Sequence, residues 1–331
     1  MNRRKFLNRA SLSALGAGMF SVGALEASEN VSVVNAKRKL LFQAGICSDV
    51  HQDIMHDGIP RLQAFVDEMN RRKVDFIIQL GDFCRPSEQN LPFLQVWKQF
   101  KGASYHVIGN HETDGGYTQE QVVSYFDMPG RYYSFDRNGY HFVVLNGNDK
   151  NPKGDKGYPR YIGEEQRRWL ADDLDKTSLP VIAFCHQGLD IDILLAVEEA
   201  SFIRLIFERA NQKAGFTKVK LVFSGHHHND YHNEINGIHY VQINSMSNFW
   251  LGNAYKTLRY SEEIDKKYPY IKYTAPYKDP IWAVMSVYNN GEIAIQGKRS
   301  EFVGATPTEL GVPLDETAYP VVAHISDREL K

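Results

Sequence analysis

Residue types that bind metal ions follow five separate apolar runs of the sequence, each at the point where the run ends. The potential ligands at these ends are Asp49 and His51, Asp82, Asn110 and His111, His186, and His226 and His228. If the runs are strands of one α/β fold, residues at their carboxyl ends face a common crevice, where such folds bind substrates. Each motif alone is weak evidence for a metal site, because Gly-Asp is frequent in turns and short motifs occur by chance. All five in order predict a metal site with nitrogen and oxygen ligands.

The densest of these ends is the cluster His226–His228, which follows the apolar run 218–223 and Gly225. In an extended chain the side chains at positions i and i+2 point to the same side. His226 and His228 would therefore supply half of a metal site, while His227 would point away. The alternative is a solvated polar turn.

The sequence pattern also predicts the elements that must position these residues. We expect strands over 40–47, 74–80, 104–108, 180–185 and 218–223, and helices over 59–72, 91–100, 163–175 and 200–211. Hairpins are expected at Asn138-Gly139, Asn236-Gly237 and Asn289-Asn290-Gly291, since such dipeptides join antiparallel strands. Alternating strands and helices require parallel pairing, so we predict an α/β fold. No repeat or long linker interrupts 40–298, which favours one domain.

Composition limits the classes of protein to consider. The chain has 331 residues, with Lys+Arg 38 against Asp+Glu 40 and 43% hydrophobic residues. This hydrophobic content is enough for a packed core. The near-zero net charge, without a basic cluster, argues against a nucleic-acid groove or an anionic membrane surface as partner. Cys47, Cys84 and Cys185 lie in or beside apolar runs, so we expect buried free thiols and no disulfide framework.

The first 27 residues differ from the rest of the chain. Arg3, Arg4 and Lys5 precede a weakly apolar stretch rich in Gly, Ala and Ser. This stretch resembles a twin-arginine export signal, and it is too short and too interrupted by glycine for a convincing membrane span. A charged tail or a retained anchor is the alternative. We predict a mature protein beginning near 25–29, with no stable membrane span after cleavage. It would be exported to the periplasm or the cell exterior after transient contact with the twin-arginine machinery.

The ordered set of motifs resembles that of the calcineurin-like metallophosphoesterases. The motifs are Asp49-x-His51, Gly81-Asp82, Gly109-Asn110-His111-Glu112, Cys185-His186 and Gly225-His226-His227-His228. They span residues 40 to about 242, which is most of the predicted mature chain. The resemblance implies a four-layer α/β/β/α sandwich of two mixed β-sheets flanked by helices, the metallo-dependent phosphatase fold, with a dinuclear metal centre.

The same resemblance implies a role for each motif residue. One metal ion would be held by Asp49, His51 and His228, the other by Asn110, His186 and His226, and Asp82 would bridge both. A bridging hydroxide would attack phosphorus. His111 would contact the phosphoryl group, as would Asn110, and would protonate the leaving oxygen; the alternative is a structural loop histidine. The ligand types suit two divalent metal ions (Mn²⁺, Fe²⁺/Fe³⁺ or Zn²⁺) and do not choose between them.

The sequence departs from the family pattern at Arg85. Many relatives have a carboxylate at this position, three residues after the bridging Asp, and it orients the general acid. Here Glu112 or another group would have to orient His111, or the histidine would act without a tight partner. We expect Arg85 to contact the substrate phosphate through its guanidinium, with a surface ion pair as the equally weighted alternative.

Substrate specificity is expected to depend on the segment 248–280, which is rich in aromatic residues and could form a wall that stacks bases or sugars. The alternative is a packed surface excursion. Segments 132–135 and 165–170 and the C-terminal strand pair resemble bacterial phosphodiesterases and the manganese-dependent ADP-ribose/CDP-alcohol pyrophosphatases more than protein phosphatases.

We therefore predict an exported enzyme that hydrolyses a small phosphorylated substrate, at a phosphodiester or nucleotide pyrophosphate bond rather than a monoester. The alternatives are a phosphomonoesterase of the same superfamily, a non-catalytic metal-binding interaction scaffold and a metal-sequestering protein. The predicted division is a signal peptide (1–27), a linker (28–39), a metallophosphoesterase domain (40–300) that includes the aromatic-rich excursion 248–280, and a C-terminal extension (301–331).

Overall fold

Two six-stranded mixed β-sheets form the centre of the fold in the computed structural model, which describes residues 38–154, 157–191, 195–313 and 319–331. The first sheet has the order β14 (Arg328–Leu330), β13 (Ile293–Gln296), β12 (Ala283–Tyr288), β1 (Leu40–Cys47), β2 (Phe76–Gln79) and β3 (Ala103–His106). In this sheet β1, β2 and β3 pair in parallel, whereas β12, β13 and β14 add antiparallel strands. The parallel strands bring the ends of β1, β2 and β3 to one edge.

The second sheet repeats this arrangement. Its order is β4 (Tyr133–Arg137), β5 (Tyr140–Val144), β6 (Val181–Phe184), β7 (Val219–Ser224), β9 (Ile238–Gln242) and β8 (Tyr231–Ile235). Strands β5, β6, β7 and β9 pair in parallel, and β4 and β8 are antiparallel edge strands. The ends of β6 and β7 therefore also meet at one edge.

Alternation of side chains along the second sheet decides what lies on each of its faces. Phe142, Phe184 and Phe223 belong to one core cluster with β1, β2 and β12 of the first sheet. Their neighbours Val143 and Val222 belong to a second cluster with α4 (Glu164–Lys176) and α5 (Ala200–Ala214). Because side chains alternate across a strand, one face packs on the other sheet and the opposite face on helices.

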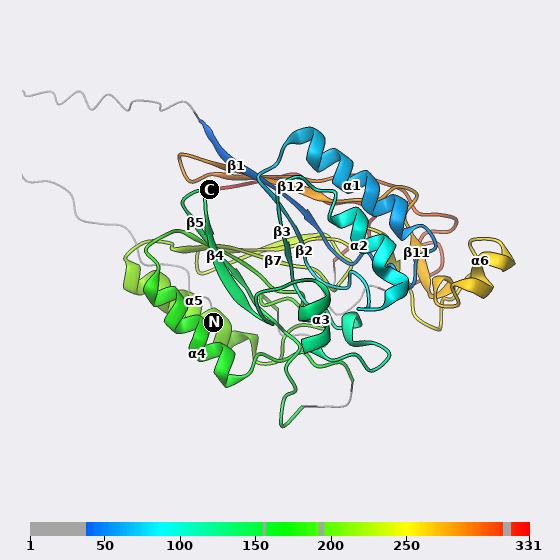
Figure 1. Ribbon diagram of the computed structural model, residues 1–331, viewed down its shortest axis with the longest axis horizontal. Coiled ribbons are helices and arrows are strands. Elements are labelled where there is room, and N and C mark those ends of the chain that lie inside the picture. The colour runs from blue at the N-terminus through cyan, green and yellow to red at the C-terminus, as the bar shows by residue number, and fades with distance from the viewer. Residues whose placement is uncertain (1–37, 155–156, 192–194, 314–318) are drawn as a thin grey trace, which may run out of the picture. The chain divides into compact units, whose positions relative to one another are not determined.

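The outer face of the first sheet is covered by α1 (Gly58–Arg72) and α2 (Leu91–Trp97), on the opposite side of the sheets from α4 and α5 (Figure 1). Helix α1 buries Leu62, Phe65 and Met69. At Gly45 of β1 an added Cβ would lie 2.3 Å from Met69 Sδ, so the helix packs where the strand has no side chain. The predicted four-layer α/β/β/α sandwich is confirmed.

The predicted hairpins are present. Asn138 and Gly139 have φ values of 50° and 81°, and Asn236 and Gly237 have values of 52° and 75°. Turns with positive φ at both central positions match the twist of antiparallel strands, which is why Asn-Gly identified them. The third hairpin joins β12 and β13.

Several predicted boundaries were wrong. The second strand is shorter than 74–80, the third ends at His106 instead of residue 108, and the helix expected over 91–100 ends at Trp97. Val107 and Ile108 are buried although they lie outside a strand. An apolar run thus indicates that residues are buried, and it does not mark the end of a strand, because the chain can stay buried after it leaves the sheet.

The segment 248–280 forms a small unit on the sandwich. Strands β10 (Asn248–Trp250) and β11 (Thr274–Pro276) pair with each other, and α6 (Glu262–Lys267) lies between them in the chain. Two further elements that the pattern did not predict are α3 (Gln119–Tyr125), which begins with a capping box at Thr118 and Gln121, and β14. The segment after residue 300 therefore completes the first sheet.

Residues 38–331 form one unit. The predicted signal peptide and residues 28–37 of the predicted linker lie outside the described residues. Cys47, Cys84 and Cys185 are buried free thiols, as expected. Within the described part of the chain, no helix has the length and apolar character needed to cross a membrane.

Candidate metal centre

The predicted ligands lie on loops that follow β1, β2, β3, β6 and β7, and backbone hydrogen bonds tie these loops together. The amide of Asp49 donates to the carbonyl of Gly81, and that of His51 donates to the carbonyl of Asp82. In the second sheet, the amide of Gly225 donates to the carbonyl of His186. The two sheets thus deliver side chains from five strand ends to one place.

The backbone at these ligands adopts a conformation that side chains rarely take. The residues with left-handed φ are Asp49 (52°), His51 (51°), Asp82 (52°), His226 (72°) and His228 (52°). For an L-residue this region costs about 1–2 kcal/mol. Such conformations persist where the surrounding structure enforces them, and they concentrate at functional sites.

The first group of donor atoms comes from Asp49, His51 and His228. The Nε2 atom of His228 lies 3.2 Å from Oδ1 of Asp49 and 3.1 Å from Nε2 of His51. His51 Nε2 lies 3.8 Å from the same carboxylate oxygen. Two imidazole nitrogens and one carboxylate oxygen at these separations can hold one ion.

The second group comes from Asp82, His186 and His226, with Asn110 beside them. The Nε2 atom of His186 lies 3.2 Å from each of Asp82 Oδ2, Asn110 Oδ1 and His226 Nδ1. Asp82 Oδ2 is also 3.9 Å from His51 Nε2, which belongs to the first group. The carboxylate of Asp82 therefore lies between the two groups, where one side chain can contact two ions.

Burial and charge favour cations at this position. Asp49 and Asp82 are 0% and 3% exposed, and their ion-pair partners are the imidazoles of His51, His186 and His228. A buried carboxylate is costly without compensating positive charge. Neutral imidazole, amide and carboxylate donors are the set that divalent first-row metals take. The residues present therefore fit two metal ions.

The pKa values of the buried carboxylates and imidazoles depend on the balance between burial and the charges of their neighbours. Burial alone would raise the pKa of Asp82, but the charges of His186 and His111 outweigh it and hold the pKa well below its usual range. Burial alone would lower the pKa of His186, yet the charge of Asp82 raises it to about 10. For His51 burial dominates and lowers the pKa to about 3, which leaves that imidazole neutral and free to bind an ion.

Hydrogen bonds outside the cluster fix the ligand orientations. Nδ1 of His186 lies 2.7 Å from the carbonyl of Leu80, so Nδ1 keeps its hydrogen, and Nε2, 3.2 Å from Asp82 Oδ2, is the nitrogen that would exchange its proton for a bound ion. Glu112 accepts bonds from the amides of Asp82, Phe83 and Gly109. His227 points away from the donor groups, with Nδ1 2.9 Å from the hydroxyl of Tyr231.

His111 lies at the edge of the cluster, where its ring centroid is 5.2 Å from that of His51. Its Nδ1 is 2.6 Å from Oδ2 of Asp114, and the hydroxyl of Tyr158 donates to Oδ1 of the same carboxylate at 2.8 Å. Burial would lower the pKa of His111, but Asp82 and the bond to Asp114 raise it to about 9. The Asp82 charge that contributes to this rise is the charge that bound cations would neutralise.

The partner of His111 is therefore Asp114 and not Glu112, whose carboxylate is occupied by backbone amides. Neither Asp114 nor Tyr158 was predicted from the sequence. The sequence signal for Asp114 is its i, i+3 spacing from His111. The structure shows a 3₁₀ turn at His111–Thr113, and side chains at i and i+3 eclipse one another in such a turn. Tyr158 comes from a distant loop, and no local pattern identifies it.

Arg85 lies in an ion pair. Its Nη2 is 3.0 Å from Oδ1 of Asp53, its backbone amide donates to Oδ2 of the same residue, and the side chain is 38% exposed. A contact between Arg85 and substrate phosphate stays a prediction.

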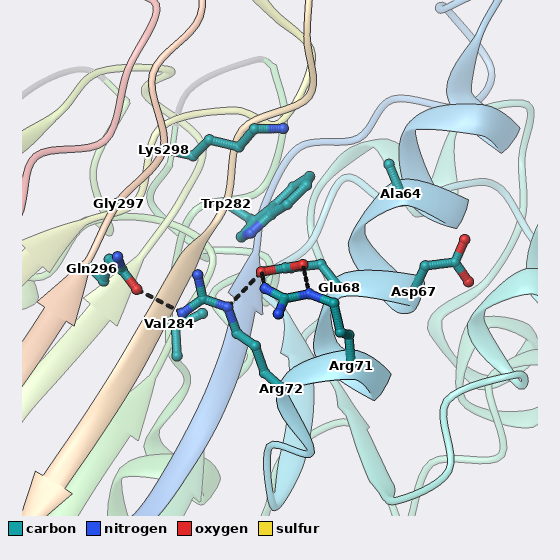
Figure 2. Close-up of a pocket in the computed structure, with 10 residues that line it drawn as sticks. All are labelled: Ala64, Asp67, Glu68, Arg71, Arg72, Trp282, Val284, Gln296, Gly297 and Lys298. Carbon is teal, nitrogen blue, oxygen red and sulfur yellow. Dashed lines mark hydrogen bonds and ion pairs between the residues drawn. The ribbon is translucent and has the colours of Figure 1, made fainter.

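A cavity of about 520 Å³ lies apart from these residues, between α1 and strands β12 and β13 (Figure 2). Glu68 accepts hydrogen bonds from both Arg71 and Arg72, and Lys298 Nζ lies 3.8 Å from the ring centroid of Trp282. None of the predicted site residues lines it. Its charges are largely paired, so the metal-ligand cluster remains the candidate site.

Comparison with curated proteins identifies two plant relatives. A manganese-dependent ADP-ribose/CDP-alcohol diphosphatase from Arabidopsis thaliana is 27% identical over 276 residues, covering 63% of this chain and 87% of that protein. The protein of the same description from Oryza sativa subsp. japonica is 27% identical over 275 residues, covering 62% of this chain and 83% of that protein.

Solved structures share the fold. A dimetal phosphatase from Danio rerio superposes with a TM-score of 0.57 at 13% identity, covering 80% of this chain and 99% of the other. GAP50, the anchor in the inner membrane complex of Plasmodium, gives a TM-score of 0.51 at 16% identity, covering 88% of each chain.

The family profile of the calcineurin-like phosphoesterases matches residues 42–230, which contain every predicted ligand. The chain therefore belongs to the calcineurin-like phosphoesterase family and is a metal-dependent phosphoester hydrolase.

Proposed function

We propose that this enzyme uses two metal ions to hydrolyse a nucleotide pyrophosphate or phosphodiester bond. The observation that carries the proposal is the position of Asp82 between the two donor groups, 3.2 Å from His186 Nε2 and 3.9 Å from His51 Nε2. The curated relatives, which are manganese-dependent diphosphatases of ADP-ribose and CDP-alcohols, support this choice of bond and of Mn²⁺.

The two ions would be held by the two donor groups. The residues are Asp49, His51 and His228 for one ion, Asn110, His186 and His226 for the other, and Asp82 for both. Ions at these positions would lower the pKa of water and stabilise negative charge on the phosphoryl group.

His111 would protonate the leaving oxygen. Its Nδ1 is bonded to Asp114, which leaves Nε2 as the donor and keeps the ring in one orientation. An imidazole paired with a carboxylate is stabilised in its protonated form, so the proton is present before the bond breaks. Tyr158 in turn holds Asp114 through its hydroxyl.

An exposed aromatic ring beside His111, that of Tyr158, supports a nucleotide rather than a simple ester. The ring of Tyr158 is 48% exposed and lies 5.0 Å from that of His111. Burial and the bond to Asp114 raise the pKa of Tyr158, and Tyr270 of the excursion 248–280 contributes a smaller effect in the same direction. Tyr270 is itself 59% exposed. Two such rings offer stacking surfaces for a base.

A screen of substrates on the purified protein tests the proposal. With Mn²⁺ added, we expect turnover of ADP-ribose, a CDP-alcohol or bis-p-nitrophenyl phosphate to exceed that of p-nitrophenyl phosphate, and Asp82→Asn to abolish all of it. Preference for p-nitrophenyl phosphate would favour the phosphomonoesterase instead. Metal binding without any turnover would contradict the proposal.

Arg85 would bind the phosphate of the substrate after release from Asp53. Arg85→Ala would then raise KM by about tenfold, as expected for the loss of a charge-assisted hydrogen bond, with little change in thermal stability. An unchanged KM for every substrate tried would leave Arg85 as an ion-pair residue only.

We propose further that the protein is exported by the twin-arginine route and cleaved near residues 25–29. Buried, unpaired thiols at Cys47, Cys84 and Cys185 are compatible with folding in a reducing compartment before export. We expect N-terminal sequencing of periplasmic protein to begin within 25–29, and Arg3→Lys together with Arg4→Lys to retain the protein in the cytoplasm. Recovery of Met1 from the exported protein would contradict this.

A further inference from the structure

Residues 319–330, which we call the C-terminal strap, pack against the sandwich. Ala323 and Ile325 are 6% and 1% exposed, and the strap ends in β14, which pairs with β13. An added Cβ at Gly297 would lie 1.9 Å from the carbonyl oxygen of Ile325, so the strap approaches where a glycine leaves room. The strap is therefore fixed in position and able to hold other segments.

The strap holds the loop that carries His228. Asp230, two residues beyond this ligand, accepts bonds from the amide and hydroxyl of Ser326 at 3.1 and 2.6 Å and from Nη2 of Arg328 at 2.7 Å. The Asp230 and Arg328 side chains are 3% and 11% exposed. A buried ion pair of this kind is geometrically demanding, so it fixes the backbone just after the ligand.

A second contact reaches the same loop. The ring of Tyr319 stacks on that of Tyr231 with centroids 4.3 Å apart and planes at 9°, and its hydroxyl donates to Asn233 Oδ1 at 2.7 Å. Tyr231 in turn places its hydroxyl 2.9 Å from Nδ1 of His227, between the ligands His226 and His228. The strap is thus connected to both sides of His228.

The strap also holds the loop that carries Asp49, through Asn244. Nδ2 of Asn244 donates to the carbonyls of Val322 and His324 at 2.7 and 3.1 Å. The next residue, Ser245, donates from its hydroxyl to the carbonyl of Asp49 at 2.8 Å. One segment therefore supports two of the three donors in the group Asp49, His51 and His228.

We propose that the C-terminal strap sets the affinity of the ion position formed by Asp49, His51 and His228 and leaves the other position largely unaffected. This inference rests on the proposed two-ion function. Most donors of the other position have separate supports, since His186 is held by the carbonyl of Leu80 and the Asp82 loop by Glu112. Its donor His226 shares only the Tyr231 contact, through the neighbouring residue His227. Arg328 and Asn244 are positioning residues, because they bond to Asp230 and to the strap, and none of their described contacts is with a donor atom.

The test is a Mn²⁺ titration of the metal-free full chain, in which calorimetry and electron paramagnetic resonance measure the binding. We expect two classes of bound ion in the unaltered protein. Arg328→Met should weaken one class by about tenfold, the effect typical of losing support behind a ligand, and leave the other within about twofold. Excess Mn²⁺ should restore kcat in the variant. Arg328→Lys should recover part of the affinity.

Glu329→Gln is the matched control, because this neighbour on β14 has a side chain that is 61% exposed and pairs with Arg38. If Arg328→Met does not fold, Tyr319→Leu removes the stack and the hydroxyl but keeps the Asp230–Arg328 ion pair. Equal weakening of both classes, or of neither, overturns the inference while leaving the two-ion function in place. Absence of Mn²⁺ binding and turnover in the unaltered protein would instead remove the proposed function, and the inference with it.

Discussion

Oδ2 of Asp114 lies 2.6 Å from Nδ1 of His111, and this contact lies within a single 3₁₀ turn. A carboxylate at this distance fixes both the ring orientation and the nitrogen that carries the transferable proton. The residue that supports the proposed general acid is thus Asp114, three positions later in the same loop, and not a residue of the strand before it.

Asp114→Asn should lower kcat by about 100-fold and leave KM and metal content nearly unchanged. The reason is that a positioned proton donor contributes roughly 10²–10⁴-fold, and an amide would favour the wrong tautomer of His111. Steady-state kinetics with a diester substrate, together with metal analysis, measure the effect. Glu120→Gln, on the exposed side of α3, is the control. A kcat within twofold of the unaltered enzyme would show that Asp114 has no such role.

Removal of metal should destabilise the fold, because the donor groups around the buried Asp49 and Asp82 come together only in the folded state, so ion binding stabilises that state. At a Mn²⁺ concentration 100-fold above Kd, one bound ion adds about 2.7 kcal/mol to the free energy of unfolding. Thermal melts with a chelator and with Mn²⁺ should therefore differ by several degrees. Asp82→Ala should lose this difference, and His232→Gln, outside the donor groups, should keep it. Equal responses of the two variants would contradict the assignment.

The stability of the protein should depend on pH through His141. Its Nδ1 is 2.6 Å from Asp136 and its Nε2 is 2.8 Å from Asp173. Burial alone would lower the pKa of His141, but these two hydrogen bonds outweigh it and raise the pKa. The contribution to stability is therefore complete below the unfolded pKa, about 6.5, and disappears as the pH rises through the folded value.

We expect the difference in unfolding free energy between the unaltered protein and His141→Gln to be larger at pH 6 than at pH 9. Urea denaturation at both pH values measures it. His239→Gln serves as the control, because this partly buried histidine lies beside His232 and has no pair of carboxylate partners among the described contacts. A difference that stays constant between the two pH values would show that the two carboxylates do not hold His141 protonated.

Gly81→Ala should lower both stability and metal affinity. Gly81 has φ of 102°, and an added Cβ would lie 2.5 Å from Nδ1 of His186 and 2.8 Å from Cα of Gly109. Gly116 has a similar φ of 88° with no atom within 4 Å of an added Cβ, so Gly116→Ala reports the backbone strain alone, about 1–2 kcal/mol. Denaturation should show a larger loss of stability for Gly81→Ala than for Gly116→Ala. Mn²⁺ titration should show a loss of metal affinity for Gly81→Ala only. Equal losses in both variants would exclude the steric effect on His186.

The sequence pattern could place the candidate donor residues at strand ends because buried strands show as short, continuous apolar runs. The Asn-Gly turns could also be predicted, since Asn and Gly are the residue types that adopt the positive φ that these hairpin turns require. What could not be predicted depends on contacts between distant segments. Tyr158 reaches Asp114 across 44 residues, and Arg328 reaches Asp230 across 98. No local pattern encodes either pair.

Short elements escaped for a different reason. β14 has three residues and gains its strand conformation from pairing with β13. A run of this length carries too little periodicity to be recognised. In contrast, α3 has a capping box at Thr118 and Gln121, so it could have been predicted from residue types alone.

The bond from Ser245 to the carbonyl of Asp49 joins residues that are 196 positions apart. On a ribosome that adds about 5–20 residues each second, the loop that bears Asp49 waits roughly 10–40 s for this partner. Strand β1 also waits for β12, which is synthesised later still. The early supports of Asp49 are Gly81 and the pairing of β1 with β2, whereas the partner donor His228 and the bonding residue Ser245 are synthesised much later, so this donor group is complete only late in translation.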